Sequence, residues 1–366
     1  MTVSAADAHF MARALQLARR GMYTTDPNPR VGCVIVKGGK IIGEGWHERT
    51  GQPHAEINAL NQAGKIHSQR SGVYVTLEPC CHSGHTPPCT QALINTGVMR
   101  VVAAMRDPNP QVAGKGFREL EENGIQVDVG LMEREAEALN PGFISRMKQG
   151  RPYVRVKLAA SLDGRTAMVK GESKWITGAA ARADVQKWRA RSSAIVTGVG
   201  TVLADNPMLT VRDLKLGRQP LRVVVDSRLR TPPTARLLQG EGKTLIVTAD
   251  QNIKQAENLK RSGAEVAYLA AKKNNVDLTA LMKHLASLEM NEVLVEAGET
   301  LCGAMLKENL VDEIVLYIAP HIMGGKEHGM FMLPALARMA DRVNLDIIDT
   351  RTIGKDWRVI VKVSEK

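Results

Sequence analysis

The sequence predicts an α/β protein of two domains, and three observations lead to this prediction. The chain has 366 residues, which is more than one ordinary hydrophobic core organises. Short apolar runs typical of strands alternate with segments of helical periodicity, as in sheets covered by helices. The alternation stops at the stretch 149–152 and then starts again. We therefore expect one domain over residues 1–147 and a second over residues 148–366.

The first domain is expected to be an α/β/α sandwich. Apolar residues recur at i, i+3, i+4 and i+7 over residues 8–20, which indicates an amphipathic helix that stops at Gly21. Gly38-Gly39 separates two strand-like runs and predicts a hairpin. The expected strands are 31–36, 40–46, 73–77, 100–105 and 126–130, and the expected further helices begin at His54, Pro88 and Gly116. Residues 133–152 are expected to form a connecting helix and a linker.

The second domain is expected to hold a mainly parallel sheet with helices on both faces. Strand candidates lie near 153–159, 194–197, 222–226, 244–248, 265–269, 292–296 and 313–318, with helices near 178–191, 252–261, 277–288 and 299–308. The last two strands, near 343–351 and 357–363, have no helix between them and should form an antiparallel edge.

Composition and charge limit the possible functions. Five cysteines, three of them between positions 80 and 89, indicate a metal site in a reducing compartment, and no signal peptide or long apolar span is visible. We therefore expect a cytoplasmic protein. Residues 1–145 carry 14 basic and 14 acidic residues, so the whole net charge of +11 lies in residues 146–366. A neutral first half argues against nucleic-acid binding, while a basic second half suits small phosphorylated ligands or is simply a solvated surface.

A zinc-deaminase pattern stands at the centre of the first domain. His54-Ala55-Glu56 is followed by Pro79-Cys80 and by Cys89, which fits H-x-E and P-C with a second cysteine. One imidazole and two thiolates leave the fourth tetrahedral position of zinc open for water, whose pKa the metal lowers. Glu56 is the expected catalytic residue, because a carboxylate beside the metal can carry a proton to the leaving ammonia. Cys81 and His82 are rival ligands, although Cys80 follows Glu-Pro as the pattern requires.

The second domain shows weaker signals. No Gly-x-Gly-x-x-Gly opens its first strand-helix unit, so a dinucleotide-binding Rossmann fold is not indicated. An apolar strand at 293–296 runs into Ala297-Gly298 and the start of a helix, where free N–H groups would suit a pyrophosphate. A plain strand-to-helix turn is the alternative at that position.

These motifs together resemble the bifunctional riboflavin-biosynthesis deaminase–reductase family over nearly the whole chain. The resemblance of the first half rests on the zinc pattern with Gly84 and Thr86-Pro87-Pro88-Cys89, on Asp26-Pro27-Asn28-Pro29, and on Asp107-Pro108-Asn109-Pro110. That of the second half rests on Lys157 to Arg165, Gly171 to Thr177, Gly198 to Pro207 and Glu296-Ala297-Gly298. The chain departs from the family at Cys81, where Ser is common, and at Ser83 and His85, where His and Arg are common.

The resemblance implies a cytidine-deaminase-like first domain and a dihydrofolate-reductase-like second domain that uses NADPH. The first would deaminate 2,5-diamino-6-ribosylamino-4(3H)-pyrimidinone 5′-phosphate, and the second would reduce the ribosyl group to ribityl. The implied cofactor contacts are Ala159, Trp175, Thr201, Asp205 and the turn Gly298, Glu299, Thr300, Leu301, Cys302, Gly303 and Ala304. The implied substrate contacts are Asn28, Ser173, Arg189, Leu209, Arg212 and Glu296. We expect a homo-oligomer, either a dimer or a tetramer, that binds neither nucleic acid nor membranes.

Two other classes of protein compete with this interpretation. A nucleic-acid-editing deaminase would need a basic, aromatic surface, which the neutral first half lacks. A purely structural zinc site would have four protein ligands and no use for the neighbouring Glu56.

Overall fold

The chain folds into two compact units, Met1–Gly150 and Arg151–Lys366. The computed structural model describes residues 4–81, 88–214, 216–325 and 328–364. Helix α7 (Pro141–Gln149) closes the first unit and ends at Gly150, which has a φ of 67°. The predicted domain limit at residue 147 thus falls inside α7.

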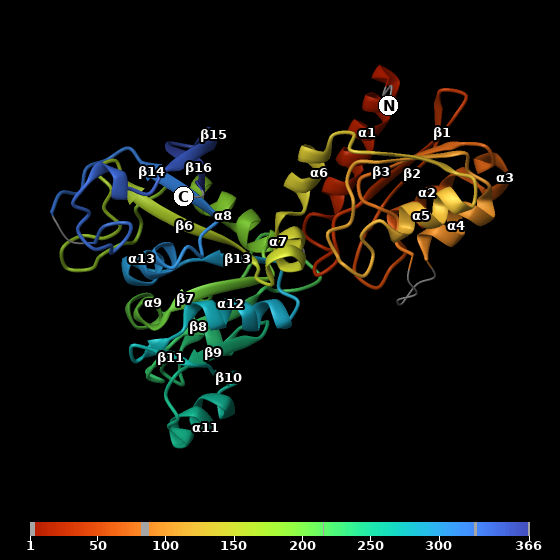
Figure 1. Cartoon of the computed structure of the whole chain (residues 1–366). Helices are drawn as coiled ribbons and strands as arrows, with labels where there is room; N and C mark the ends of the chain where they lie inside the picture. Colours follow the sequence, from red (N-terminus) through yellow and green to blue (C-terminus); the bar gives the residue numbers. More distant parts are fainter. Residues whose placement is uncertain (1–3, 82–87, 215, 326–327, 365–366) are drawn as a thin grey trace. The chain divides into compact units, whose positions relative to one another are not determined.

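A five-stranded sheet in the order β2-β1-β3-β4-β5 forms the centre of the first unit (Figure 1). The expected hairpin is present, because β1 and β2 pair antiparallel around Gly38 and Gly39, whose φ values are 57° and 73°. β3 pairs antiparallel with β1 and parallel with β4, and β4 pairs parallel with β5. The strands are β1 (Gly32–Lys37), β2 (Lys40–Trp46), β3 (Gly72–Val75), β4 (Arg100–Ala103) and β5 (Gln126–Val129).

Helices cover both faces of this sheet, which confirms the predicted α/β/α sandwich. One apolar cluster joins the sheet to α1, α6 and α7, and a second joins it to α2, α4 and α5. The predicted connecting helix at 133–152 is in fact two helices, because Asn140 leaves helical geometry between them. The helices are α1 (Ala5–Ala18), α2 (Ala55–Ala63), α3 (Lys65–Ser68), α4 (Cys89–Thr96), α5 (Lys115–Glu122), α6 (Glu133–Leu139) and α7.

Helix α2 rests directly on the backbone of β2. A Cβ atom built on Gly43 would overlap the carbonyl oxygen of Ala59, and one built on Gly45 would overlap that of Ala55. Strand glycines commonly mark such a close approach of two backbones. The contact fixes the first turn of α2, where His54 and Glu56 lie.

The second unit is built on a nine-stranded sheet in the order β10-β9-β8-β7-β13-β6-β14-β16-β15. All pairs from β10 to β14 are parallel, and β14, β16 and β15 pair antiparallel, as predicted. Parallel strands place their carboxyl ends at one edge, where ligands of open α/β sheets bind. The strands are β6 (Tyr153–Ser161), β7 (Ala194–Gly198), β8 (Leu221–Val225), β9 (Thr244–Thr248), β10 (Ala264–Tyr268), β13 (Glu292–Val295), β14 (Glu313–Ala319), β15 (Leu345–Ile353) and β16 (Asp356–Val363).

The four predicted helices of this unit are α8 (Ala179–Arg191), α11 (Ile253–Arg261), α12 (Leu278–Ser287) and α13 (Glu299–Lys307). Helices α12 and α13 pack into one large apolar cluster with the sheet, and α9 to α11 pack into another. Two short helices and a small hairpin were not predicted, because elements of two to seven residues give no clear periodicity. They are α9 (Val199–Asp205), α10 (Arg236–Gln239), and β11 (Ala271–Lys272) paired with β12 (Asn275–Val276). Across the described residues, the helices are all too short or too polar to cross a bilayer.

Candidate functional sites

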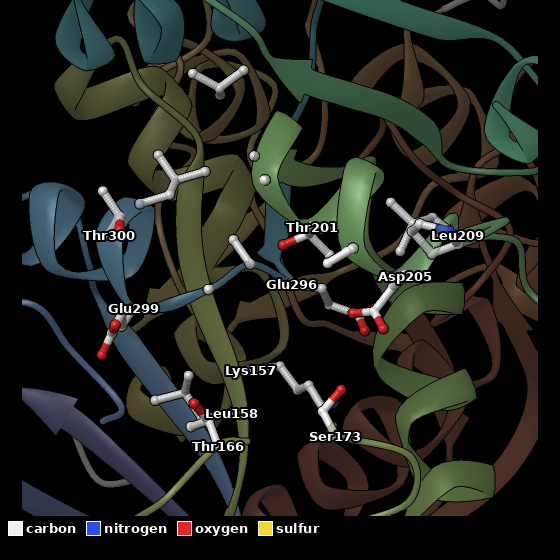
Figure 2. Close-up of a pocket in the computed structure, with 18 of the residues that line it drawn as sticks. Lys157, Leu158, Thr166, Ser173, Thr201, Asp205, Leu209, Glu296, Glu299 and Thr300 are labelled. Carbon is white, nitrogen blue, oxygen red and sulfur yellow. The ribbon is translucent and has the colours of Figure 1, made fainter. Parts of the chain in front are cut away.

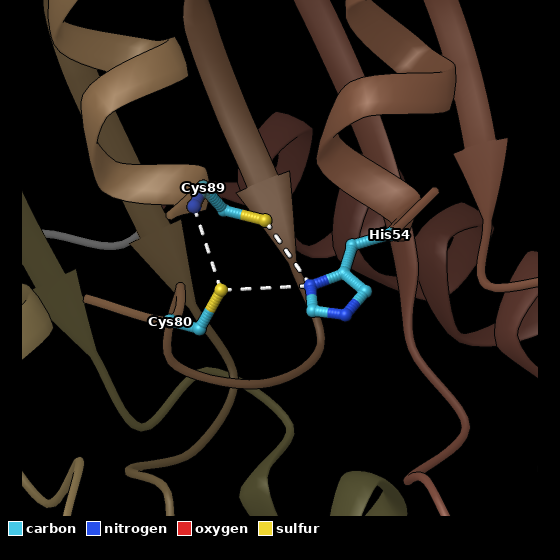
Figure 3. Close-up of side chains that lie close together, drawn as sticks. All are labelled: His54, Cys80 and Cys89. Carbon is cyan, nitrogen blue, oxygen red and sulfur yellow. Dashed lines mark hydrogen bonds between the residues drawn. The ribbon is translucent and has the colours of Figure 1, made fainter. Parts of the chain in front are cut away.

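The three predicted zinc ligands converge in the first unit (Figure 3). His54 is the N-cap of α2, Cys89 is the first residue of α4, and Cys80 lies in the loop after β3. The Nδ1 atom of His54 lies 3.5 Å from the Cys80 sulfur and 3.3 Å from the Cys89 sulfur. All three ligand atoms lie within 4.8 Å of one another, which suits one shared metal ion.

The charge state of this cluster also fits a metal. The pKa of the Cys80 thiol falls to about 4, because the Cys89 thiol and His54 hydrogen-bond to its sulfur while burial opposes them. The pKa of the buried Cys89 thiol rises, first because of its hydrogen bond to Cys80. A bound divalent cation favours the thiolate form of both. One imidazole and two sulfurs leave a fourth tetrahedral position free for water, so the donor set fits catalytic zinc.

Of the two rival ligands, Cys81 does not join this group. Cys81 is half-buried, and burial raises the pKa of its thiol, which disfavours the thiolate form that binds metal. Among the described residues, the cluster contains His54, Cys80 and Cys89 alone. His82, together with Ser83, Gly84, His85 and Thr86, lies outside the described residues.

Glu56 lies in the first turn of α2 beside the cluster and is 3% exposed. Its carboxylate accepts a hydrogen bond from the Cys89 thiol. Burial raises the pKa of Glu56 to about 7, and the neighbouring Cys80 adds to the shift. A buried carboxyl with this pKa can take up and release a proton near neutral pH.

Three further side chains surround the cluster, and sequence reasoning found only Asn28. The Asn28 amide lies 3.2 Å from Nε2 of His47, and the His47 ring centroid lies 5.3 Å from that of His54. Asp107 follows β4, is 8% exposed, and has its pKa raised to about 6 by burial, with Glu78 and Cys80 contributing. Asp107 could have been predicted from the sequence, because it follows β4 as Cys80 follows β3. The two strands pair in parallel, so their carboxyl ends lie at one edge of the sheet.

Glu78 ties the zinc-ligand loop to the loop that carries Asp107. Its Oε2 atom accepts hydrogen bonds from the N–H groups of Asp107 and Gly114 at 3.1 and 2.9 Å, and Oε1 accepts from Gly116 at 3.0 Å. The side chain is buried, so the bonds from Asp107 and Gly116 are shielded from water, and that from Gly114 is partly shielded. Glu78 therefore sets the position of Cys80, two residues on, relative to Asp107.

The second unit has a large cavity at the carboxyl ends of β6, β13, β7 and β8 (Figure 2). Its volume of about 1880 Å³ exceeds the usual range for one small ligand and allows a dinucleotide beside a substrate. Nearly all predicted residues of this domain line it: Ala159, Ser173, Trp175, Arg189, Thr201, Asp205, Leu209, Arg212, Glu296, Gly298, Glu299, Thr300, Leu301 and Ala304.

Two of the expected cofactor contacts do not line the cavity. Cys302 is fully buried and its thiol donates to the Ala297 carbonyl, while Gly303 packs against the backbone of Met332. Both lie on the inner face of α13, whereas Glu299, Thr300, Leu301 and Ala304 of the same helix line the cavity. Gly298, the N-cap, provides no side-chain cap, so the first N–H groups of α13 are open to an anionic ligand.

A buried group of charges lies beneath the cavity. The Arg189 guanidinium makes two hydrogen bonds to the Glu296 carboxylate, at 2.5 and 3.0 Å. Burial alone would raise the pKa of Glu296, but the charge and bonds of Arg189 outweigh it and lower that pKa. Lys157 of β6 faces the same space, and burial lowers the pKa of its ammonium group. Sequence reasoning included Lys157 in a stretch that carries the family resemblance but gave its side chain no role.

The loop 206–213 is held in an unusual conformation at the rim. Leu209 has a φ of 51° although it is buried and branched, and such a residue is strained in the left-handed region. Gln219 offsets the strain by accepting from the N–H of Val211 and donating to its carbonyl, at 2.8 and 3.1 Å. The Gln186 side chain accepts from the N–H of Arg212 at 2.9 Å. These bonds keep Leu209 and Arg212 at the cavity wall.

Each of the two units matches a known protein family. Residues 4–105 match the family described as the cytidine and deoxycytidylate deaminase zinc-binding region, and residues 152–359 match the RibD C-terminal domain. The second match covers more than half of the chain. This chain belongs to the RibD family. The fold classes expected for both units, cytidine-deaminase-like and dihydrofolate-reductase-like, are confirmed.

Relatives in the RibD family match over nearly their whole length. The riboflavin biosynthesis protein RibD of Escherichia coli is 49% identical, covering 96% of this chain and 97% of the relative, and that of Haemophilus influenzae is 47% identical, covering 97% of both. The solved structure of Acinetobacter baumannii RibD has a TM-score of 0.90 at 43% identity and covers 98% of this chain and 99% of its own. A Thermotoga maritima protein described as a diaminohydroxyphosphoribosylaminopyrimidine deaminase/5-amino-6-(5-phosphoribosylamino)uracil reductase has a TM-score of 0.88 at 33% identity, with the same coverage.

Proposed function

We propose that this chain catalyses two successive steps of riboflavin biosynthesis. The first unit hydrolytically deaminates 2,5-diamino-6-ribosylamino-4(3H)-pyrimidinone 5′-phosphate. The second unit reduces the ribosyl side chain of the product with NADPH to give 5-amino-6-ribitylaminouracil 5′-phosphate. One observation supports the proposal most strongly. The first unit of the chain has a His-Cys-Cys cluster beside the buried Glu56, and the second unit has a cavity large enough for a dinucleotide.

In the deamination, the residues of the first unit bind, orient and move protons. His54, Cys80 and Cys89 would hold zinc, which would supply a nucleophilic water at neutral pH. Glu56 takes a proton from the attacking water and gives it to the departing amine, so one water is consumed and one ammonia is released. Asn28 holds the pyrimidine, and His47 orients the Asn28 amide through their 3.2 Å contact.

In the reduction, bound NADPH would supply a hydride to the ribosyl C1′, and the protein supplies position and a proton. Lys157 gives that proton to the ring oxygen that is released when the sugar opens, because its lowered pKa makes it a better acid than an ordinary lysine. Arg189, Arg212 and Ser173 hold the substrate, with Arg212 on its phosphate. The first turn of α13 receives the pyrophosphate of NADPH, while Trp175 and Asp205 border the cofactor.

We also propose that the two activities divide between residues 1–147 and 148–366, and that the enzyme is a cytoplasmic homo-oligomer. The five free thiols support a reducing compartment. The exposed apolar side chains of the edge strand β15, Leu345, Ile347 and Ile348, support contact with a second copy.

The test is a product assay with a matched variant. Purified protein should convert the diaminopyrimidine phosphate to the deaminated product without NADPH and to the ribityl product with it, as identified by mass spectrometry. Glu56→Gln should keep its zinc and lose deamination by ~10²–10⁴-fold while still reducing pre-deaminated substrate. The exposed Glu48→Gln carries the same change and should behave as wild type. Near-normal deamination by Glu56→Gln would contradict the role of Glu56.

A further inference from the structure

The start of helix α8 has no cap of its own. Its N-cap, Gly178, has no side chain, and the first turn, Ala179-Ala180-Ala181, contains no acid. Helix α1 shows the bond that is missing, because Asp7 at its third position accepts a hydrogen bond from the N-cap N–H of Ser4 at 2.9 Å. An alanine at the same position of α8 cannot make that bond. The free N–H groups and the positive end of the helix dipole therefore need a partner from elsewhere in the chain.

That partner is Asp356, the first residue of β16. Its Oδ2 atom accepts a hydrogen bond from the N–H of Gly178 at 2.8 Å, and the residue is only 2% exposed. The hairpin turn before it lies directly against the helix, because a Cβ atom built on Gly354 would come within 2.8 Å of the Ala180 methyl carbon. Asp356 thus makes for α8 the bond that Asp7 makes for α1.

The middle of α8 is fastened to the same hairpin by a separate group of side chains. Asp184 accepts hydrogen bonds from the Tyr317 hydroxyl at 2.7 Å and from the Arg358 guanidinium at 2.8 Å. Arg358 also donates to Asp349 of β15 at 2.9 Å. Arg358 and Asp356 are two residues apart on β16, so both side chains point to the face that α8 covers. Loss of the Asp356 contact would therefore release the first turn of α8 and leave the middle of the helix in place.

The first turn of α8 holds the loop that precedes it, residues 171–177, which forms part of the cavity wall. The Arg182 guanidinium donates to the Thr177 carbonyl at 2.6 Å, and its Cζ atom lies 4.7 Å from the centroid of the Trp175 six-membered or five-membered ring system. Trp175 is 69% exposed, so its ring gains little restraint from packing. Ser173 and Trp175, the expected contacts of substrate and cofactor, therefore depend on the start of α8 for their positions.

A second contact holds the same loop more weakly. Lys174 pairs with Asp205 at 3.3 Å, but the two side chains are 51% and 34% exposed. Exposed ion pairs of this kind contribute little, because solvent screens them. The junction with α8 is thus the firmer anchor of the loop.

We propose that Asp356 is a positioning residue of the reductase site, which fixes the start of α8 and, through it, the loop 171–177. The inference rests on the proposed function of the second unit. Because one loop carries both Ser173 and Trp175, its release would weaken substrate and cofactor by the same factor, the inverse of the fraction of molecules with the loop in place. Saturating ligands would draw the loop back, so kcat would change little.

The experiment compares the full-length wild type with Asp356→Ala and Asp356→Asn. Steady-state kinetics give kcat and the KM of each reductase substrate, and calorimetry with NADPH gives the affinity and the number of sites. Asp356→Ala should raise both KM values about 5- to 10-fold, the effect of one lost helix cap, with kcat within about twofold of wild type. Asp356→Asn keeps an acceptor oxygen for the Gly178 N–H, so its KM values should stay within about threefold of wild type.

The matched control removes a cap from another helix. Asn252→Ala takes the side-chain cap from α11, a helix that contributes no residue to the described cavity wall. This variant should lose thermal stability and keep the KM values of the wild type. A rise in its KM values equal to that of Asp356→Ala would overturn the proposal, because any lost cap would then have the same effect.

A simple loss of folded protein gives a different pattern, with fewer NADPH sites and a lower kcat at unchanged KM. That pattern in Asp356→Ala would overturn the proposal, as would a rise in KM for one ligand alone. An Asp356→Asn protein as impaired as Asp356→Ala would show that the bond to Gly178 is not the cause. These results leave the proposed reductase intact, because the wild type still turns over. A wild type that binds neither ligand would overturn both proposals together.

Discussion

Replacing Glu78 by glutamine should destabilise the first unit without removing any zinc ligand. The carboxylate accepts hydrogen bonds from three N–H groups, two of them buried, so the substituted amide keeps one acceptor oxygen and turns an NH₂ group toward at least one of these donors. One buried donor left unsatisfied costs ~1–3 kcal/mol, and the two remaining bonds lose the strength that the negative charge gave them. The sum is about 2 to 4 kcal/mol in the free energy of unfolding.

The assay is urea denaturation of the full chain, with zinc release to a chelating dye as the signal of the first unit. Linear extrapolation gives the free energy of unfolding, and NADPH binding in the absence of urea checks the second unit. Glu121→Gln, on the exposed side of α5, is the control with the same loss of charge. A Glu78→Gln protein within ~0.5 kcal/mol of wild type would falsify the idea that this carboxylate joins the two loops, since exposed substitutions have effects of that size.

Three further predictions concern the metal, the pH dependence and the buried ion pair. Cys80→Ala should lose zinc, as measured by mass spectrometry of the purified protein, whereas Cys81→Ser should keep it; the reverse result would exchange their roles. Because burial raises the pKa of Asp107 to about 6, the folded state holds this proton more tightly than the unfolded state, and stability falls as pH rises from about 4 to 6. Asp107→Asn should flatten that part of the stability–pH curve, and an unchanged curve would contradict the cause given. Arg189→Met should lower the free energy of unfolding by ~3 kcal/mol, because it leaves Glu296 buried without its partner. Adding Glu296→Gln should recover most of this stability but not the reductase activity. Failure of the second change to recover stability would show that the two residues are not coupled.

Periodicity along the chain was enough to predict most of the fold. The strand prediction 244–248 coincides with β9, and the two terminal strands were expected to form the antiparallel edge that β15 and β16 form. The zinc cluster could equally be predicted from the sequence, because His54, Cys80 and Cys89 belong to a motif whose spacing is constrained by the metal. These features could be predicted from local sequence, because each of them depends on residues that are close together along the chain.

The features that were missed depend on neighbours in space. His47 lies near the metal ligands only because β2 runs beside α2, and its own sequence context shows no motif. The hairpin of β11 and β12 consists of two-residue strands, below the length at which alternation can be recognised. Tertiary proximity of this kind leaves no periodic signal.

The contact of α2 with Gly43 and Gly45 has a consequence for how the deaminase half tolerates change. Elsewhere in a protein, a larger residue on a sheet can be accommodated when the opposing side chains shrink. Here the atoms that an added side chain would meet first are backbone carbonyl oxygens of α2, so shrinking a side chain cannot make enough room, and only a displacement of α2 itself would. In a saturation mutagenesis screen for deamination, both positions should therefore reject every residue, with a profile as strict as that of Glu56. Sequence variation at these two positions should therefore be near zero. A search that identifies catalytic residues only by their intolerance to substitution would select both glycines, although neither contacts the substrate.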